Sequence, residues 1–247
     1  MKLIVSAASD VGCVRNNNED MILIGDSYVR NDAKAVEVDI DTETRYLLAL
    51  ADGMGGHNSG EVASQVTLSN LHYFFYDLPT GLSVSDFNEA IYEWLESINA
   101  VIDSKGHAEP RFYNMGTTLV ALAYFNNEFY WMNCGDSRVY LLHDGKLTQL
   151  STDHSLNNLM GKSGHSNIIT NCIGGGCKTS YVDMVICTPQ VMPDETFMLC
   201  SDGLTDMLSD EEIENMLNNG ADAAQLCDAA NKAGGSDNVS VCLIKIV

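Results

Sequence analysis

A chain of 247 residues in which 45% are hydrophobic is long enough for one domain with a substantial core. Its 34 acidic residues outnumber its 13 basic residues, and the net charge of -21 argues against a surface that binds nucleic acid. The sequence shows neither an apolar stretch of membrane-spanning length nor a signal-peptide pattern, so no membrane contact and a cytoplasmic location are expected.

Apolar runs with strand character recur along the chain. In chain order, the predicted strands cover residues 2–7, 21–24, 46–51, 118–124, 128–134, 138–143, 182–188, 196–200 and 239–247. The pairs Asn126-Asn127 and Asp144-Gly145 each separate two of these strands and are typical of tight hairpin turns. Neighbouring strands joined in this way are expected to pair in antiparallel fashion.

Helices are predicted where apolar residues recur about every 3.6 positions. They cover residues 59–76, 85–104, 211–218 and 221–233. Ser83 or Ser85 would cap the second helix, and Ser209 with Glu212 has the pattern of a capping box at the start of the third.

The order of the elements indicates an α+β protein with antiparallel sheets, because hairpin-linked strands are kept apart from paired helices. No proline-rich linker, composition break or repeat divides the chain, so residues 1–247 are expected to form a single domain. Surface loops are expected at Gly81, over residues 106–110 and over residues 157–167.

Acidic residues recur at the ends of the predicted strands. Each lies beside a Gly, a Ser, an Asn or another acid: Glu19, Asp20, Asp52, Asp136, Asp202 and Asp237. Carboxylates at strand ends can converge in space although they lie far apart in sequence. Because Mg²⁺ and Mn²⁺ prefer oxygen ligands, the pattern predicts a divalent metal site for phosphate chemistry. The glycine after Asp52 would let the backbone carbonyl of Gly53 approach the same metals.

Single motifs also allow structural interpretations. Asp52-Gly53 can be an ordinary turn, and Asp136 can pair with Arg138 within a local turn, which is the interpretation we favour for that motif taken alone. Arg15, just ahead of the first acidic pair, can form an ion pair or clamp a phosphate with its planar guanidinium.

Two histidines are candidates for proton transfer, since histidine titrates near neutral pH. They are His57 and His154, and for His154 we favour a role in fixing a loop. The sequence lacks the Gly-x-Ser-x-Gly pattern of acyl-transfer enzymes.

Cys172 and Cys177 flank three consecutive glycines. A zinc site is not expected there, because neither a Cys-x-x-Cys pair nor paired histidines accompany them. The eight cysteines are expected to be reduced thiols, as in most cytosolic proteins.

Taken together and in order, the motifs resemble those of the PPM/PP2C family of metal-dependent Ser/Thr protein phosphatases in its compact bacterial form. They are Arg15-Asn16-Asn17-Asn18-Glu19-Asp20, Ala51-Asp52-Gly53-Met54-Gly55-Gly56-His57, Gly116-Thr117-Thr118, Gly135-Asp136-Ser137-Arg138, Ser201-Asp202-Gly203-Leu204 and Gly235-Ser236-Asp237-Asn238. The resemblance implies a four-layer αββα sandwich of two antiparallel sheets, with Mn²⁺ or Mg²⁺ ions in a cleft at one edge. It also implies hydrolysis of phosphoserine and phosphothreonine in proteins by direct attack of a metal-bridging water.

The resemblance assigns metal-binding roles to individual residues. Asp52 would bridge two metal ions, and Asp202 with Asp237 would bind the first of them. The carbonyl of Gly53 would serve the second.

Further roles follow from the same resemblance. Glu19 and Asp20 would serve the second metal, directly or through water, and Asp136 would help bind a weaker third ion. Arg15 would grip the substrate phosphate. His57 follows the bacterial pattern, and either a histidine or a metal-bound water would protonate the leaving group.

The chain departs from the family pattern in two places. Animal-type members have a histidine at the position of Met54. The segment between Leu156 and Ile168 is shorter than the flap of bacterial relatives, and a trimmed flap would leave the cleft more open.

The leading hypothesis is a monomeric Ser/Thr protein phosphatase that acts on phosphorylated proteins and opposes a bacterial Ser/Thr kinase. Two alternatives remain: a catalytically silent PPM-like module that binds phosphoproteins, and a hydrolase of small-molecule phosphoesters.

Overall fold

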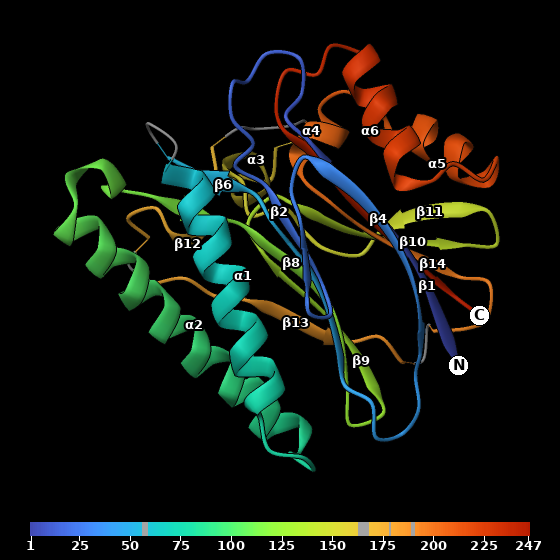
Figure 1. Ribbon diagram of the computed structural model, residues 1–247, viewed down its shortest axis with the longest axis horizontal. Helices are drawn as coiled ribbons and strands as arrows, with labels where there is room; N and C mark the ends of the chain where they lie inside the picture. The colour runs from blue at the N-terminus through green and yellow to red at the C-terminus, as the bar shows by residue number, and fades with distance from the viewer. Residues whose placement is uncertain (56–58, 163–167, 178, 189–190) are drawn as a thin grey trace.

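Two six-stranded antiparallel sheets lie face to face between two groups of helices (Figure 1). The computed structural model describes residues 1–55, 59–162, 168–177, 179–188 and 191–247. The first sheet has the order β11 (Lys146–Gln149), β10 (Arg138–His143), β14 (Thr196–Cys200), β15 (Val239–Ile246), β1 (Lys2–Asp10) and β4 (Asp32–Asp39). The second has the order β13 (Asp183–Ile186), β9 (Glu128–Cys134), β8 (Leu119–Phe125), β5 (Tyr46–Ala51), β2 (Met21–Ile24) and β3 (Ser27–Val29).

Helices cover both outer faces of this pair of sheets (Figure 1). The second sheet is covered by α1 (Ser59–Asp77) and α2 (Val84–Ala108). The first sheet is covered by α4 (Asp202–Thr205), α5 (Asp210–Asn218) and α6 (Ala223–Lys232). Two further short helical elements lie in the described part of the chain, the 3₁₀ turn Pro110–Phe112 and α3 (Leu156–Leu159).

Three buried apolar clusters separate these four layers. Leu48, Val120 and Phe197 belong to the cluster between the two sheets. Phe87 belongs to the cluster beneath α1 and α2, and Leu226 to the cluster beneath α4 to α6. The predicted αββα sandwich is therefore confirmed.

A small third sheet lies at one end of the sandwich, beside the start of α1 (Figure 1). Its strands are, in order, β12 (Ile173–Gly174), β7 (Gly116–Thr117) and β6 (Gly53–Met54). Because β6 follows β5 after one residue, this sheet holds the backbone on both sides of Asp52.

The N-terminal and C-terminal strands are neighbours within the first sheet. β1 and β15 pair in antiparallel register from Leu3 opposite Ile246 to Asp10 opposite Val239. The segment that follows β1 is thereby placed beside the segment that precedes β15, which joins the first acidic motif to the last.

The predicted long helices and core strands are confirmed, with ends that differ by a few residues. Ser83 caps α2 by accepting a hydrogen bond from the N–H of Asp86, and Ser209 forms the predicted capping box with Glu212. Both hairpin turns are confirmed, with positive φ angles at Asn126-Asn127 and Asp144-Gly145.

The strands that were not predicted are β6, β7 and β12 of the small sheet and three edge strands of the two large sheets, β3, β4 and β11. β4 alternates between exposed and half-buried residues and carries Lys34 and Glu37. Charged edge strands discourage pairing with other molecules, but their apolar signal is weak. One helical turn, α3, also occupies the start of the expected 157–167 loop. In the described part of the chain, every helix is too short or too polar to cross a bilayer.

Candidate active site

Five aspartates from separate elements meet at one end of the sandwich. We call them the carboxylate cluster: Asp20, Asp52, Asp136, Asp202 and Asp237. Asp52 is at the centre, because the charges of the other four all raise its pKa, after the larger effect of burial. The structure thus brings together the acids that the sequence analysis expected at one site.

The ends of strands and one short helix position these side chains. Asp20 immediately precedes β2, Asp52 joins β5 to β6, and Asp237 is two residues before β15. Asp136 lies in the turn between β9 and β10, whereas Asp202 is the first residue of α4 rather than part of a plain turn.

The backbone of Asp52 is fixed by the Gly-Thr-Thr motif. Its carbonyl oxygen accepts hydrogen bonds from the N–H of Thr118 at 2.9 Å and from Oγ1 of Thr117 at 2.8 Å. Its N–H donates to Oγ1 of Thr118 at 3.1 Å. These bonds hold the backbone of Asp52 in place and do not involve its carboxylate, which can therefore bind a ligand.

Asp20 is fully buried. Oγ of Ser201 donates to its Oδ2 at 2.8 Å, while its Oδ1 has no hydrogen-bond partner among the described residues. Burial, followed by the charges of Asp202 and Asp237, raises the pKa of Asp20 to about 7, although hydrogen bonds from Ser240 and Ser201 oppose the shift. A buried carboxylate with an unpartnered oxygen is costly unless a cation or proton accompanies it.

Asp136 repeats this pattern. It is 2% exposed, and its Oδ1 has no partner within the described residues. Burial first, and the charge of Asp202 second, raise its pKa to about 7. Arg138 binds both carboxylate oxygens of Asp153, at 2.7 to 3.0 Å. The favoured local pairing of Asp136 with Arg138 was therefore wrong, because Asp153 takes the guanidinium.

His154 holds the turn that carries Asp136. Its Nδ1 accepts hydrogen bonds from the N–H of Gly135 at 3.1 Å and from Nδ2 of Asn171 at 2.8 Å. Its Nε2 lies 3.0 Å from Oδ2 of Asp183. This pattern assigns the ring hydrogen to Nε2 and gives His154 the structural role that the sequence analysis favoured.

Arg15 and Glu19 border the cluster. Nη2 of Arg15 donates to Oδ2 of Asp237 at 2.6 Å, and about half of the Arg15 side chain is exposed. Burial raises the pKa of Glu19, while the N–H of Gly60 and the charge of Arg15 oppose that shift. Arg15 is therefore the cation that a ligand at this site would meet from the solvent side.

The glycine after Asp52 is required by packing. A Cβ at Gly53 would lie 2.2 Å from the carbonyl oxygen of Gly60 and 2.6 Å from that of Glu19. The backbone at Gly53 is thus packed against the start of α1 and the first acidic motif, while the approach of its carbonyl to metal ions stays a prediction.

Asn238 is a positioning residue to which the sequence analysis gave no role. Its Oδ1 accepts from the N–H of Glu19 at 2.8 Å, and its Nδ2 donates to the carbonyls of Val11 and Asn17, each at 2.9 Å. Its place directly after Asp237 was the available signal. Asn238 ties the first motif to the last.

Arg30 was also missed. Its Nε donates to the carbonyl oxygen of Asp20 at 2.7 Å, and its Nη1 lies 3.0 Å from Oε1 of Glu61. Burial lowers its pKa. No sequence pattern pointed to this residue, because its contacts come from separate elements.

Two expectations fall outside the described residues. His57 lies within residues 56–58, and part of the shortened flap lies within residues 163–167. The two ends of the flap segment are joined by hydrogen bonds from the N–H of Leu156 to the carbonyl of Ile168 and from Thr170 to His154, each of 2.8 Å.

The chemistry of the cluster fits divalent cations. Its ligands are hard carboxylate oxygens, and two of them, Oδ1 of Asp20 and Oδ1 of Asp136, lack partners among the described residues. No three of the described His, Cys, Asp and Glu side chains are already arranged around a single ion position. The cluster therefore supplies negative charge and oxygen donors for cations, but its described side chains do not already enclose one ion position.

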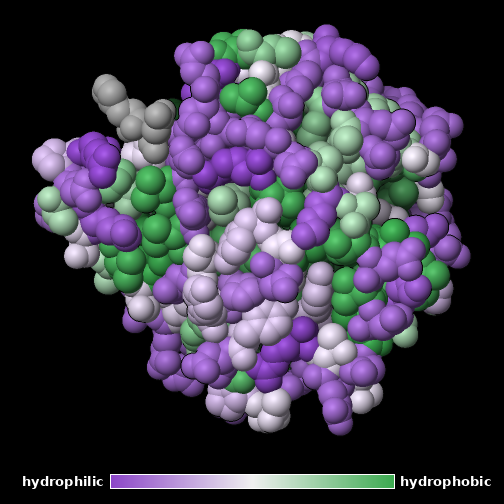
Figure 2. Space-filling model, viewed as in Figure 1, coloured by the Kyte–Doolittle hydropathy of each residue, from purple (hydrophilic) through white to green (hydrophobic). Residues whose placement is uncertain are grey.

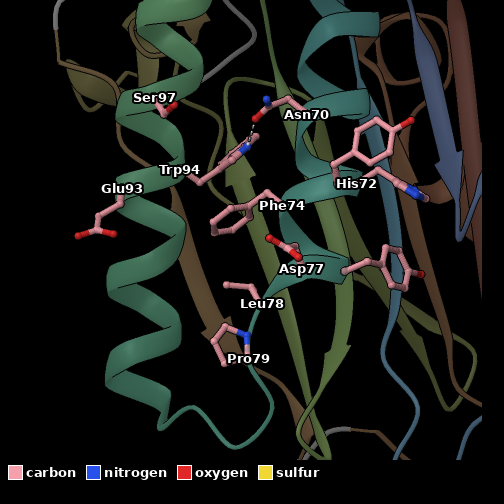
Figure 3. Close-up of a pocket in the computed structure, with 11 residues that line it drawn as sticks. Asn70, His72, Phe74, Asp77, Leu78, Pro79, Glu93, Trp94 and Ser97 are labelled. Atoms are coloured by element: carbon pink, nitrogen blue, oxygen red, sulfur yellow. Dashed lines mark hydrogen bonds between the residues drawn. The ribbon is translucent and has the colours of Figure 1, made fainter.

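A separate groove of about 830 Å³ lies between α1 and α2. Figure 2 shows hydrophobic residues exposed between these helices, and Figure 3 shows Nε1 of Trp94 donating to Oδ1 of Asn70, at 2.7 Å. Asp77 and Glu93 also line the groove, but the carboxylate cluster does not contribute to it. The groove is distinct from the candidate site.

Comparisons with known proteins agree with this site. A family model described as Protein phosphatase 2C matches residues 24–239. The serine/threonine protein phosphatase PstP of Mycobacterium tuberculosis is 33% identical over 98% of this chain, which covers 45% of PstP, about half of its length. Protein phosphatase PhpP of Streptococcus pneumoniae is 32% identical, with 98% of this chain and 97% of PhpP covered. The crystal structure of the PstP catalytic domain in complex with two manganese ions is 32% identical, with a TM-score of 0.75 and 100% of both chains covered.

Proposed function

The chain belongs to the protein phosphatase 2C family, and from this premise we propose that it is a metal-dependent hydrolase of phosphoserine and phosphothreonine in proteins. The observation that carries the proposal is the carboxylate cluster, in which four neighbouring acids raise the pKa of Asp52, after the larger effect of burial, and two members have oxygens without partners among the described residues. The proposal treats residues 1–247 as one phosphatase domain.

The metal-binding roles are part of the proposal. Two Mn²⁺ or Mg²⁺ ions supply, when bound, an activated water and a polarised phosphoryl group. Asp52 would contact both ions, Asp202 and Asp237 the first, and the Gly53 carbonyl the second. Their support is the convergence of the carboxylate cluster around Asp52.

Glu19 and Asp20 would hold the second ion, and Asp136 a third. After the larger effect of burial, the charges of Asp202, Asp153 and Asp206 raise the pKa of Asp136, and this local excess of negative charge supports a further cation beside it. His57 remains the candidate for protonating the leaving oxygen.

Arg15 would bind the substrate phosphate. A protein with a net charge of -21 needs local positive charge to receive an anionic substrate, and the exposed guanidinium of Arg15 lies at the rim of the cluster. Binding would exchange one carboxylate partner, Asp237, for the phosphate oxygens, to which a planar guanidinium can donate two parallel hydrogen bonds.

The proposed substrates are phosphorylated proteins, including those modified by a bacterial Ser/Thr kinase, and the proposed form is a monomer. A cytoplasmic location is supported by the eight cysteines, all of which are free thiols. Static light scattering would test the monomer, since a mass near twice 26.9 kDa would contradict it.

The decisive experiment measures phosphate release from a phosphothreonine peptide with Mn²⁺ and with EDTA, using the wild-type chain and Asp237→Asn. We expect release by the wild-type chain with Mn²⁺ alone. The matched control is Asp144→Asn, which makes the same chemical change in an exposed hairpin turn with a positive φ angle that asparagine tolerates. It should retain wild-type turnover.

The alternatives predict other outcomes. A silent phosphoprotein-binding module would bind the peptide without releasing phosphate at any Mn²⁺ concentration. A hydrolase of small phosphoesters would cleave nucleotides or sugar phosphates with a higher kcat/KM than the peptide. Either result would replace the proposed function.

A further inference from the structure

Cys172 and Cys177 form a close pair of thiols outside the carboxylate cluster. The thiol of Cys172 donates a hydrogen bond to Sγ of Cys177, and the two sulfur atoms are 3.4 Å apart. A disulfide requires an approach to roughly 2 Å, which rotation of the side chains can provide. The two residues are close in sequence, but the geometry of the intervening turn decides whether their side chains meet.

That turn consists of three glycines in the left-handed region. Gly174, Gly175 and Gly176 have φ angles of 73°, 61° and 77°. The N–H of Gly175 donates to the carbonyl of Met115 at 2.8 Å, and the N–H of Cys177 donates to that of Gly174 at 2.9 Å. The chain is thus folded back on itself and held, so that the thiols face each other in the reduced protein.

The turn is also too tightly packed for side chains. A Cβ at Gly174 would lie 2.5 Å from Cγ2 of Ile102, and a Cβ at Gly175 would lie 2.9 Å from Sγ of Cys172. Larger residues would push the two sulfur atoms apart. The Gly-Gly-Gly sequence therefore has a physical reason that the proposed phosphatase chemistry does not require.

The two thiols differ in access. Cys172 is 5% exposed, and burial, together with the hydrogen bond that it makes with Cys177, raises its pKa. Cys177 is partly exposed and lines a cavity of about 460 Å³ with Asn114 and Tyr113. A small oxidant can therefore reach Cys177 first. Cys172 is buried next to Cys177 and donates its thiol hydrogen to the sulfur of Cys177.

We propose that Cys172 and Cys177 are a redox modification site at which a hydroperoxide forms a reversible disulfide. The sulfur of Cys177, as thiolate, attacks one peroxide oxygen, the O–O bond breaks, and the departing oxygen takes a proton to leave as water or alcohol. The sulfur of Cys172 then attacks the resulting sulfenic acid. The S–S bond forms, the S–O bond breaks, and the hydroxide leaves as water with the proton of Cys172.

The disulfide would close a ring at the outer strand of the small sheet. β12 pairs with β7, which pairs with β6, the strand that follows Asp52. The crosslink would restrain the Gly175 N–H that bonds to Met115. Hydrogen exchange at this amide should therefore slow on oxidation, whether or not the protein is a phosphatase.

Two other uses of the thiols are less well supported. A metal site is not favoured, because no third His, Cys, Asp or Glu side chain completes one in the described part of the chain. Cys134 is a competing disulfide partner, since it is buried near enough for the charges of both thiols to affect its pKa. The experiment must separate these cases.

The test is peptide mapping after graded hydrogen peroxide, with and without later dithiothreitol. Trypsin cleaves after Lys162 and Lys178 and releases one peptide, 163–178, that contains both cysteines. We expect this peptide to become about 2 Da lighter, since two hydrogens leave, and to regain its mass with dithiothreitol. The exposed thiol of Cys13 provides the control variant Cys13→Ser, in which this change should persist.

Cys177→Ser should slow the oxidation of Cys172 at least tenfold, because the accessible thiol is missing. Cys172→Ser should leave Cys177 as a sulfenic acid that a dimedone probe labels. The proposal is overturned if peptide 163–178 keeps both thiols while Cys13 is oxidised. It is also overturned if Cys172 becomes linked to the peptide that contains Cys134, or if Cys177 passes to the sulfinic acid with Cys172 still reduced.

Discussion

The guanidinium of Arg15 meets the carboxylate of Asp237 at 2.6 Å across 222 residues of sequence. Both side chains are partly exposed, so the ion pair contributes no more than about 1 kcal/mol to stability. The contact therefore matters more for the site than for stability, because it places a partly exposed cation against one of the proposed metal ligands.

Arg15→Ala should raise KM for a phosphothreonine peptide at least about tenfold, with a smaller effect on kcat, since a phosphate clamp binds ground state and transition state alike. Arg15→Lys keeps the charge but cannot donate two parallel hydrogen bonds, so its KM should lie between those of the wild type and Arg15→Ala. Steady-state kinetics would reveal this order. A loss of kcat at unchanged KM would give Arg15 a different role.

Asp52→Asn should lower kcat at least about a hundredfold at saturating Mn²⁺, because the central carboxylate of the cluster loses its charge. The same variant should be at least as stable as wild type in EDTA. Burial and four neighbouring acids raise the pKa of Asp52, so its neutral isostere removes repulsion without leaving a cavity. Thermal unfolding in EDTA checks the predicted stability of the variant, and a Tm far below that of the wild type would show that Asp52 is instead a structural residue.

The metal-free protein should lose stability as pH rises from about 4 to 7. The folded-state pKa of Asp136 is raised from 3.8 to about 7. Within this window the unfolded chain releases the proton while the folded chain keeps it. The stabilisation that Asp136 provides is therefore fully present below the unfolded pKa of 3.8 and is lost as pH rises through the folded pKa of about 7. The slope approaches about 1.4 kcal/mol per pH unit for each such group.

Urea unfolding in EDTA between pH 4.5 and 8 measures this slope. Asp136→Asn should flatten it, and saturating Mn²⁺ should reverse the loss at the upper end. A wild-type stability that rises steadily with pH in EDTA would contradict the raised pKa values.

His154→Ala should destabilise the protein by about 1–3 kcal/mol, because the buried N–H of Gly135 loses its acceptor. The turn that carries Asp136 should loosen as well, so that more Mn²⁺ is needed for half-maximal activity. Asp183→Asn is the control: the side chain of Asp183 is 42% exposed, and the amide oxygen can still accept from Nε2 of His154. If both variants lose stability equally, the bond to Gly135 is not what matters.

Gly203→Ala should disrupt the site through a steric clash. A Cβ at Gly203 would lie 1.9 Å from the carbonyl oxygen of Asn238, so the segments that carry Asp202 and Asp237 would have to separate. Overpacking of this kind costs about 1–3 kcal/mol, and we expect at least tenfold lower activity. Gly81→Ala, which has no atom within 4 Å of the added Cβ, should cost only about 1 kcal/mol for its left-handed backbone and keep full activity.

Local patterns were sufficient to predict the central strands, the long helices and the convergence of the acids. The apolar run before Asp52 has a strand signal, and acids beside small or turn-forming residues at several strand ends indicated one shared site. The partner of Arg138 could not be predicted in this way, because Asp153 is reached through the folding of β10 and β11, not through adjacency in sequence.

The residues that hold the carboxylate cluster in place were harder still to predict from the sequence. The contacts of Arg30 with Asp20 and Glu61 join the first acidic motif to α1, and the role of Asn238 requires β1 and β15 to be neighbours. Neither follows from a periodicity or a spacing. Buried polar networks depend on which surfaces meet, and that information appears with the tertiary fold.

The pairing of β1 with β15 also has a consequence for the order of assembly. A nascent chain on the ribosome cannot form this pair until almost all of the described residues have emerged. Contacts between such distant segments close slowly, because a long loop must be ordered first. The site that contains both Asp20 and Asp237 therefore cannot form before β15 has emerged, because the pairing of β15 with β1 brings Asp237 to the first acidic motif.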